Sequence, residues 1–270
     1  MKDITIRTIY GAVFVTVVIG SILLHPYAFM MVAAVAAVIG MFEFTRLFFK
    51  EDSYKNHLVF YITGFLAYLI IALAGLKVIP FYTIIWLIPV PFILTGFELF
   101  RKQGASWQHL NVYFSGLLYV VVPFGLMNAL FYTGNSEAAY PGILIAIFVL
   151  VWANDVFAYL SGTYLGKHKL FPSVSPKKTW EGTLGGLLFT LLFAALVFYI
   201  TKELNLRDWL LLAIMVSVLS TIGDLAESLL KRNSGVKDSG TLIPGHGGIL
   251  DRFDAALFVT PFVFLYFTVI

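Results

Sequence analysis

Long apolar runs constrain this chain more than any other feature. Nine runs of about 20 residues, the length that an α-helix needs to cross the hydrocarbon core of a bilayer, follow one another along the sequence. They cover residues 5–24, 27–49, 57–76, 78–99, 111–132, 141–165, 182–201, 207–230 and 249–269. We therefore expect an all-α polytopic membrane protein with about nine transmembrane helices.

The composition agrees with a membrane protein. Of the 270 residues, 60% are hydrophobic and 12% are charged, whereas about 25% of the residues of a soluble domain are charged. No long polar block is present that could form a separate soluble domain. We expect residues 1–110 to form an N-terminal helical section, used for packing, a lipid cavity or a dimer contact. Residues 111–270 would form the section that carries the chemistry.

Two kinds of site have no basis in the composition. The chain has no cysteine, which excludes disulfides and thiolate metal sites. Its net charge is only +3, and a few basic loops give no support for nucleic-acid binding. We therefore expect no nucleic-acid partner.

The first run could be read as a signal peptide, because it follows Lys2 and Arg7. It ends at His25 and Pro26 rather than at a cleavage site of small residues. We therefore expect it to be retained as the first membrane helix. The least certain division lies between the third and fourth runs, which only Lys77 and Pro80 interrupt.

The basic residues predict which side of the membrane each loop faces. With nine spans, the N-terminus and the loops after the second, fourth, sixth and eighth spans share one face. Of the 18 lysines and arginines, all but Lys77, Lys202 and Arg207 lie on or beside that face. Cytoplasmic loops carry an excess of basic residues, so we expect a cytoplasmic N-terminus and a cytoplasmic loop at residues 231–248.

Four carboxylates flank this polar loop near the end of the chain: Asp224, Glu227, Asp251 and Asp254. The members of each pair are three residues apart and would share one face of a helix. Two such faces brought together would form an oxygen-rich pocket for a hard cation such as Mg²⁺. We expect Asp224 and Asp251 as direct ligands, because each lies deep in its apolar flank, and Glu227 as a third. The alternative is that each acid pairs with a nearby lysine or arginine and only holds the helices together.

The loop between the acids has features of a phosphate-binding segment. Glycines let backbone N–H groups approach a phosphate closely, and basic side chains add charge. With cysteine absent, a phosphate donor or a turn residue is a better interpretation of His246 than a zinc ligand. The candidate phosphate-binding residues of this region are Ser228, Lys231, Arg232, His246, Gly247 and Gly248.

A second basic loop covers residues 166–182, and its Lys177 and Lys178 come just before an apolar run. A helix N-terminus offers free N–H groups to an anion, so these lysines are candidates to bind a triphosphate or a lipid phosphate. The alternative is simple anchoring at anionic lipids. We expect Glu181 to cap the start of the helix.

The sixth run contains one acid, Asp155, which follows Asn154. An ionisable residue inside a membrane segment indicates function unless it has a structural partner. We expect Asn154 and Asp155 to contribute to nucleotide binding, through a base or ribose edge.

From Ser228 to Asp254 the chain resembles the signature of the phosphatidate cytidylyltransferase (CDP-diacylglycerol synthase) family. The matching positions are Ser228, Lys231, Arg232, Lys237, Asp238, Gly240, Pro244, His246, Gly247, Gly248, Asp251, Arg252 and Asp254. The segments 175–182 and 154–159 also resemble this family. The first half of the chain matches it only in being multispanning.

This resemblance implies an integral membrane enzyme of phospholipid biosynthesis. It would join CTP and phosphatidic acid, with Mg²⁺, to give CDP-diacylglycerol and pyrophosphate. The resemblance also places metal-binding acids at Asp224 and Asp251. The catalytic residues that we expect are Asp224, Lys237, Asp238, Asp251, Arg252 and Asp254.

The location that we expect is the bacterial cytoplasmic (inner) membrane, with the active site facing the cytoplasm. We also expect a homodimer. The sequence leaves open the acyl-chain preference and whether a second metal ion binds. Alternatives are another CTP-dependent lipid enzyme, either a CDP-archaeol synthase or a polyprenol kinase, and an ion-coupled transporter.

Overall fold

The computed structural model describes residues 2–49, 54–101, 105–132, 139, 141–201, 204–242, 245 and 247–269. Seven helical segments in these residues are long and apolar enough to cross a membrane: Pro26–Phe48, Leu58–Gly75, Phe81–Leu99, Trp107–Tyr132, Gly142–Leu165, Trp180–Ile200 and Leu206–Asn233. Helices α1 (Lys2–Leu24) and α10 (Leu250–Val269) precede and follow them. Together these segments coincide with the nine predicted runs to within a few residues. The all-α polytopic fold is therefore confirmed, and the chain is an integral membrane protein.

The chain divides into two compact units. The first unit is Met1–Pro141 with Asp238–Arg252 and Phe267–Ile270, and the second is Gly142–Lys237 with Phe253–Tyr266. The predicted boundary at residue 110 falls inside the first unit. Helix α10 contributes its two ends to the first unit and its middle to the second.

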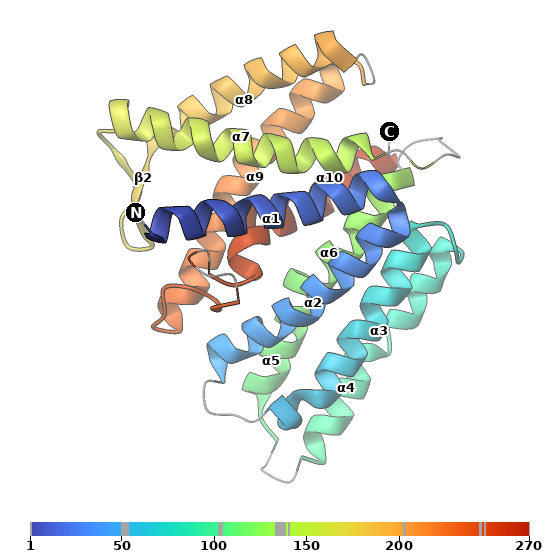
Figure 1. The fold of residues 1–270 in the computed structure, drawn as a ribbon. Helices are drawn as coiled ribbons and strands as arrows, with labels where there is room; N and C mark the ends of the chain where they lie inside the picture. The colour runs from blue at the N-terminus through green and yellow to red at the C-terminus, as the bar shows by residue number, and fades with distance from the viewer. Residues whose placement is uncertain are drawn as a thin grey trace. The chain divides into compact units, whose positions relative to one another are not determined.

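The first unit is a bundle of helices in which α2 packs against α3, α5 and α6 (Figure 1). Its elements after α1 are α2 (Pro26–Phe48), η1 (Tyr54–His57), α3 (Leu58–Gly75), η2 (Phe81–Leu87), α4 (Val90–Leu99), α5 (Trp107–Gly116), η3 (Leu117–Val121), α6 (Val122–Ala129) and η4 (Leu130–Tyr132). Large side chains fill the bundle and are almost fully buried, among them Phe29, Phe44, Phe60, Tyr68 and Phe124.

Prolines explain why two spans of this unit are not single regular helices. A proline inside a helix lacks an N–H, and its ring clashes with the carbonyl four residues earlier. The turn before Pro123 therefore widens into the π-helical segment η3, which joins α5 to α6. In the fourth span, Pro89 and Pro91 stand where the 3₁₀ segment η2 gives way to α4.

The end of α3 settles the division that the sequence left least certain. Lys77 has a positive φ of 57°, the left-handed conformation that commonly ends a helix. The N–H of Val78 donates to the carbonyl of Leu73 at 2.9 Å, and the N–H of Lys77 donates to that of Ala74 at 3.1 Å. This pair of bonds is a Schellman motif, and Pro80 follows it, so α3 ends where the prediction divided the third and fourth spans.

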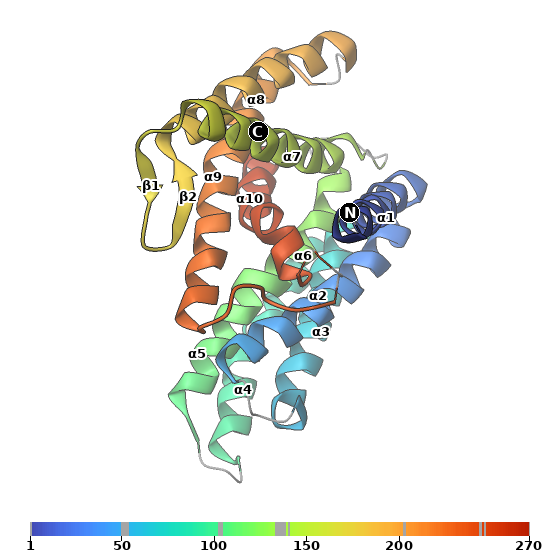
Figure 2. The ribbon, with the colours of Figure 1, turned by 60° about the vertical axis from the view of Figure 1, so that its left-hand side comes forward.

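The second unit consists of α7 (Gly142–Leu165), β1 (Lys169–Phe171), β2 (Ser175–Thr179), α8 (Trp180–Thr201), α9 (Leu206–Asn233) and the middle of α10. The two strands pair antiparallel, with Lys169 opposite Thr179 and Phe171 opposite Ser175. Figure 2 shows this hairpin at one end of α7 and α8. The strands were not predicted, since the basic segment 166–182 was expected to be a loop.

Small residues let the helices of this unit approach closely, as is common in membranes. On α8, a Cβ added to Gly186 would lie 3.0 Å from the Cβ of Ala158 on α7, and one added to Gly182 would lie 2.9 Å from the Ala158 carbonyl oxygen. On α9, a Cβ at Gly223 would lie only 2.7 Å from the Cβ of Phe258 on α10. Glycine at these positions is therefore required by the packing of neighbouring helices.

Candidate active site

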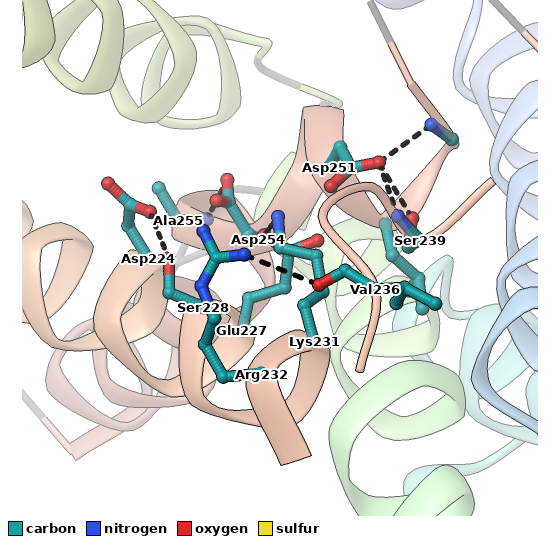
Figure 3. A network of polar contacts seen from close by, with 12 residues as sticks. Asp224, Glu227, Ser228, Lys231, Arg232, Val236, Ser239, Asp251, Asp254 and Ala255 are labelled. Atoms are coloured by element: carbon teal, nitrogen blue, oxygen red, sulfur yellow. Dashed lines mark hydrogen bonds and ion pairs between the residues drawn. The ribbon is translucent and has the colours of Figure 1, made fainter. Parts of the chain in front are cut away.

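Three carboxylates gather in the second unit, on the facing sides of α9 and α10. One oxygen of each of Asp224, Glu227 and Asp254 lies within 4.8 Å of the others, and Figure 3 shows the three residues with their neighbours. Asp224 and Glu227 are one turn apart on α9. Gly223 brings α10 close to them, since a Cβ there would lie 3.0 Å from the carbonyl oxygen of Asp254.

Two lysines partly neutralise this carboxylate cluster. Lys231 Nζ lies 2.6 Å from Glu227 Oε2, and Lys178 Nζ, from β2, lies 2.5 Å from Asp224 Oδ2. Glu227 is only 1% exposed. Carboxylate oxygens so close together repel one another unless cations are present, and a hard divalent cation is usually held by such oxygens. The donor set therefore fits Mg²⁺.

A cavity of about 530 Å³ lies beside Asp224 in the second unit. It is lined by residues of α7, the hairpin, α8 and α9. Three of them are lysines, Lys169, Lys177 and Lys178, and hydroxyl groups come from Thr163, Thr179, Thr183, Thr221 and Tyr159. A cavity with three cations and several hydroxyl groups is suited to a polyphosphate, because each phosphate oxygen accepts strong bonds from charged donors.

The start of α8 is capped by Thr179, whose Oγ1 accepts from the N–H of Gly182 at 3.1 Å. The cap that was predicted, Glu181, does something else. Its carboxylate accepts from the N–H groups of Lys167 and His168 at 3.1 Å and bonds to the His168 ring. Glu181 therefore fixes the base of the hairpin, which carries Lys177 and Lys178.

Asp251 lies in the first unit, at the start of α10. Its Oδ2 accepts three hydrogen bonds, from Ser239 N and Oγ at 2.9 Å each and from Gly248 N at 2.8 Å. Figure 3 shows the bonds from Ser239. The N–H of Gly248, a candidate phosphate donor, is thus bonded to a carboxylate of its own chain. Gly247 has a φ of 81°, which explains the need for glycine at this turn.

Glu43, in the middle of the apolar α2, bonds to the same loop. It accepts from Ile249 N at 3.0 Å, Leu250 N at 2.9 Å and Ser239 Oγ at 3.2 Å. The first two donors belong to the N-terminus of α10, where a negative charge is favourable. A Cβ on Gly240 would lie 2.9 Å from the Glu43 carboxyl carbon. Glycine at this position thus leaves room for Glu43.

The comparisons with known proteins agree with this geometry. The model of the cytidylyltransferase family matches residues 5–270. This chain belongs to the cytidylyltransferase family.

Three bacterial relatives show how similar the chain is to named members of this family. A phosphatidate cytidylyltransferase of Staphylococcus haemolyticus is 40% identical over 176 residues, 65% of this chain and 65% of the relative. Those of Staphylococcus saprophyticus and Staphylococcus aureus strain COL are 41% and 40% identical over 177 residues, again 65% of each chain. The match therefore covers slightly less than two thirds of the length of these relatives.

Within this member of the family, the predicted metal ligands Asp224 and Glu227 lie together, and Asp254 joins them. Asp254 was predicted as a catalytic residue but not as a ligand. Asp251, the other predicted ligand, has the partners Ser239 and Gly248 in the first unit, and its role toward a metal stays a prediction.

The predicted nucleotide-binding pair lies on α7, and both residues line the cavity of the second unit. Asn154 is 3% exposed and also joins α7 to α9. It donates to Ser220 Oγ at 3.1 Å and accepts from Ser217 Oγ at 2.7 Å. Asp155 is exposed on the same helix. The structural role of Asn154 is therefore clear, whereas nucleotide binding by either residue stays a prediction.

The other predicted residues are spread over the polar segment. Ser228 donates to Asp224 at 3.5 Å, and Arg232 donates to the carbonyl of Val236 at 3.4 Å, which closes the turn after α9. Three further candidates, Lys237, Asp238 and Arg252, are exposed. His246 lies outside the described residues, so its phosphate role stays a prediction.

Sequence reasoning gave no role to Lys169 or Glu43. Lys169 stood among several basic residues of one segment, and only the strand pairing shows that it lines a cavity. Glu43 had a signal, since it is an acid in the middle of an apolar run, but nothing in the sequence identifies partners about 200 residues away.

Proposed function

We propose that this protein is a phosphatidate cytidylyltransferase, which converts CTP and phosphatidic acid to CDP-diacylglycerol and pyrophosphate. The observation that carries the proposal is the contact between Lys178, from the three-lysine cavity, and Asp224, from the carboxylate cluster. It joins a surface for polyphosphate to a set of ligands for a divalent cation. The family membership and the names of the relatives support the same activity.

The chemistry needs little from a general base. The phosphate of phosphatidic acid is already anionic near neutral pH, and one of its oxygens attacks the α-phosphorus of CTP. A new P–O bond forms, the bond from the α-phosphorus to the bridging oxygen of the β-phosphate breaks, and pyrophosphate leaves with the electron pair. Catalysis of such a reaction consists mainly of positioning and of stabilising negative charge.

In this account the residues of the second unit have separate tasks. Lys169, Lys177 and Lys178 bind the phosphates of CTP. Asp224, Glu227 and Asp254 would hold Mg²⁺, which, when bound, neutralises charge on phosphate oxygens. Lys231 balances the charge of Glu227 and keeps its carboxylate in place.

We further propose that the site faces the cytoplasm of a bacterial cell, in the cytoplasmic membrane. The distribution of lysine and arginine supports this orientation. The cytoplasm is also where CTP is available. The polar segments that carry Lys178 and Lys231 both follow spans that end on this side in the predicted topology.

The experiment that tests this function is incubation of the purified protein with labelled CTP and phosphatidic acid, with and without Mg²⁺. We expect CDP-diacylglycerol and pyrophosphate only when all three are present. A protein that transfers label to archaeal-type lipids or polyprenol, or that makes no product, would refute the proposal. Asp224→Asn should remove the activity while the protein still inserts into membranes.

A further inference from the structure

Each compact unit contains a cavity of several hundred Å³, and the two cavities differ in chemistry. The cavity of the second unit, described above, has three lysines. The cavity of the first unit has a volume of about 450 Å³, and among the described residues that line it Arg46 is the one fully cationic side chain. Much of its wall is apolar and comes from Ile39, Phe42, Phe49 and Leu242.

We propose that the cavity of the first unit binds the phosphoglycerol group of the lipid substrate, while the cavity of the second unit binds the nucleotide. This inference rests on the proposed function, and it divides the two substrates of that reaction between two sets of residues. The lipid phosphate would bind to Arg46. The glycerol and the first carbons of the acyl chains would contact Phe42 and Phe49.

The position of the cavity along the helices supports a lipid headgroup. Arg46 lies in the last turn of the membrane-spanning helix α2, and His57 immediately precedes α3. The cavity therefore lies where one span ends and the next begins, which is the depth of lipid headgroups. Phe42, one turn earlier on α2, is 40% exposed, as expected of a side chain beside acyl chains.

The charge of the cavity favours a monophosphate with an apolar body. A nucleoside triphosphate carries about four negative charges at neutral pH, each phosphate group adding to them, and one arginine does not balance them. Arg46 can bind one phosphate through two parallel hydrogen bonds. The acid that lines the cavity, Glu43, accepts bonds from Ser239, Ile249 and Leu250, so its carboxylate is already hydrogen-bonded within the protein.

The wall of the cavity is held by contacts among its lining residues and with the neighbouring Tyr113, so the shape is preformed. Thr45 Oγ1 and Tyr61 OH are 2.7 Å apart, and His57 Nδ1 lies 2.9 Å from Tyr113 OH. The ring of Phe49 stacks on that of His57, with centroids 5.0 Å apart. A preformed pocket of a few hundred Å³ is typical of small-molecule sites.

The test is steady-state kinetics of Arg46→Ala with each substrate varied in turn. Loss of a charged hydrogen bond should raise the KM for phosphatidic acid by about tenfold to a hundredfold. The KM for CTP should change less than about twofold, and Arg46→Lys should recover part of the loss, because a lysine keeps the charge but not the paired bonds. The matched control is Arg207→Ala, at the other end of α9 from Asp224, which should behave as wild type.

An unchanged KM for phosphatidic acid in an active Arg46→Ala protein would overturn this inference and leave the proposed function standing. An equal rise of both KM values would also overturn it. If the wild-type protein makes no product at all, the proposed function fails and this inference fails with it.

A second measurement uses the wild-type chain and does not depend on the folding of a variant. A short-chain phosphatidic acid with a photoreactive group near the glycerol should label the peptide that contains Phe42 and Phe49, and unlabelled phosphatidic acid should compete. Labelling only within residues 142–237 would overturn the inference, because the lipid would then occupy the second unit.

Discussion

At the residue scale, four carboxylates of this protein differ in the groups that hold them. Glu227 and Asp224 are each bound by a lysine, whereas Glu43 and Asp251 are bound by N–H and hydroxyl groups of one loop. The first pair therefore lies where carboxylates and lysines are mixed, which suits the binding of both a metal ion and a phosphate. The second pair gives a fixed conformation to the segment that contains the family signature.

Glu43→Gln tests whether this second pair matters for activity. An amide accepts on one side only, so at least one buried N–H of Ile249 or Leu250 would lose its partner, at a cost of about 1–3 kcal/mol. We expect lower thermal stability in detergent and a lower kcat per folded molecule, because the signature loop loses its anchor.

Glu98→Gln is the matched control for this variant. Glu98 is also a buried acid of the first unit, 4% exposed, and it accepts from Ser106 N and pairs with His109 at 2.7 Å. The control should lose stability but keep its kcat. Equal kcat values for the two variants would show that Glu43 is only a stabilising residue.

At the element scale, the approach of α10 to α9 builds the carboxylate cluster. Gly223 permits it, since any Cβ there would press on Phe258 and on the backbone of Asp254. The cluster is thus a product of packing, and one methyl group at the right position should disturb it.

We expect Gly223→Ala to move the helices apart and to raise the Mg²⁺ concentration needed for half-maximal activity by about tenfold, the size seen when the support of a metal ligand is lost. Gly96→Ala is the control, because a Cβ at Gly96 of α4 has nothing within 4 Å. Titration of Mg²⁺ against CDP-diacylglycerol formation checks both. The same Mg²⁺ dependence in both variants would contradict this role of Gly223.

The elements show what the sequence could and could not predict. The spans were predictable because their signal is length and apolarity. The end of α3 was placed correctly by Lys77 and Pro80. The hairpin of Lys169 and Lys178 was not predicted, because strands of three and five residues are too short to show an alternating pattern. The π-helical turn before Pro123 was not predicted either, because it can be recognised only once the helix on each side of it is known.

The sequence predicted which residues belong to the site better than it predicted which of them contact one another. The spacing of Asp224 and Glu227 indicated a shared face, and the structure shows their oxygens together. That Asp254 completes the cluster depends on which face of α10 meets α9, and spacing within one helix does not determine this. The same limit applies to Glu43, whose partners are distant in sequence.

At the scale of the whole molecule, the two units do not follow the predicted division of the chain at residue 110. Segments from the C-terminal part, Asp238–Arg252 and Phe267–Ile270, belong to the first unit. The signature segment therefore contributes to both units, because Ser228 and Lys231 lie in the second. The homodimer stays a prediction.

The predicted orientation can be measured directly, because the chain has no cysteine and single cysteines can be introduced. Ser173→Cys, in the turn of the hairpin, should react with a membrane-impermeant maleimide only from the cytoplasmic side. Ala139→Cys, just before α7, should react from the opposite side. Labelling of Ser173→Cys from outside intact cells would contradict the topology.

The central claim is that Asp224, Glu227 and Asp254 form one divalent-cation site, and binding of Mn²⁺ to the purified protein, followed by electron paramagnetic resonance, tests it most directly. Loss of a ligand should weaken binding more than the 10–100-fold that loss of a supporting residue causes. We expect Asp254→Asn to weaken Mn²⁺ binding by about a hundredfold or more, while Asp208→Asn, an acid at the far end of α9, binds as wild type. Wild-type Mn²⁺ affinity in Asp254→Asn would contradict the account.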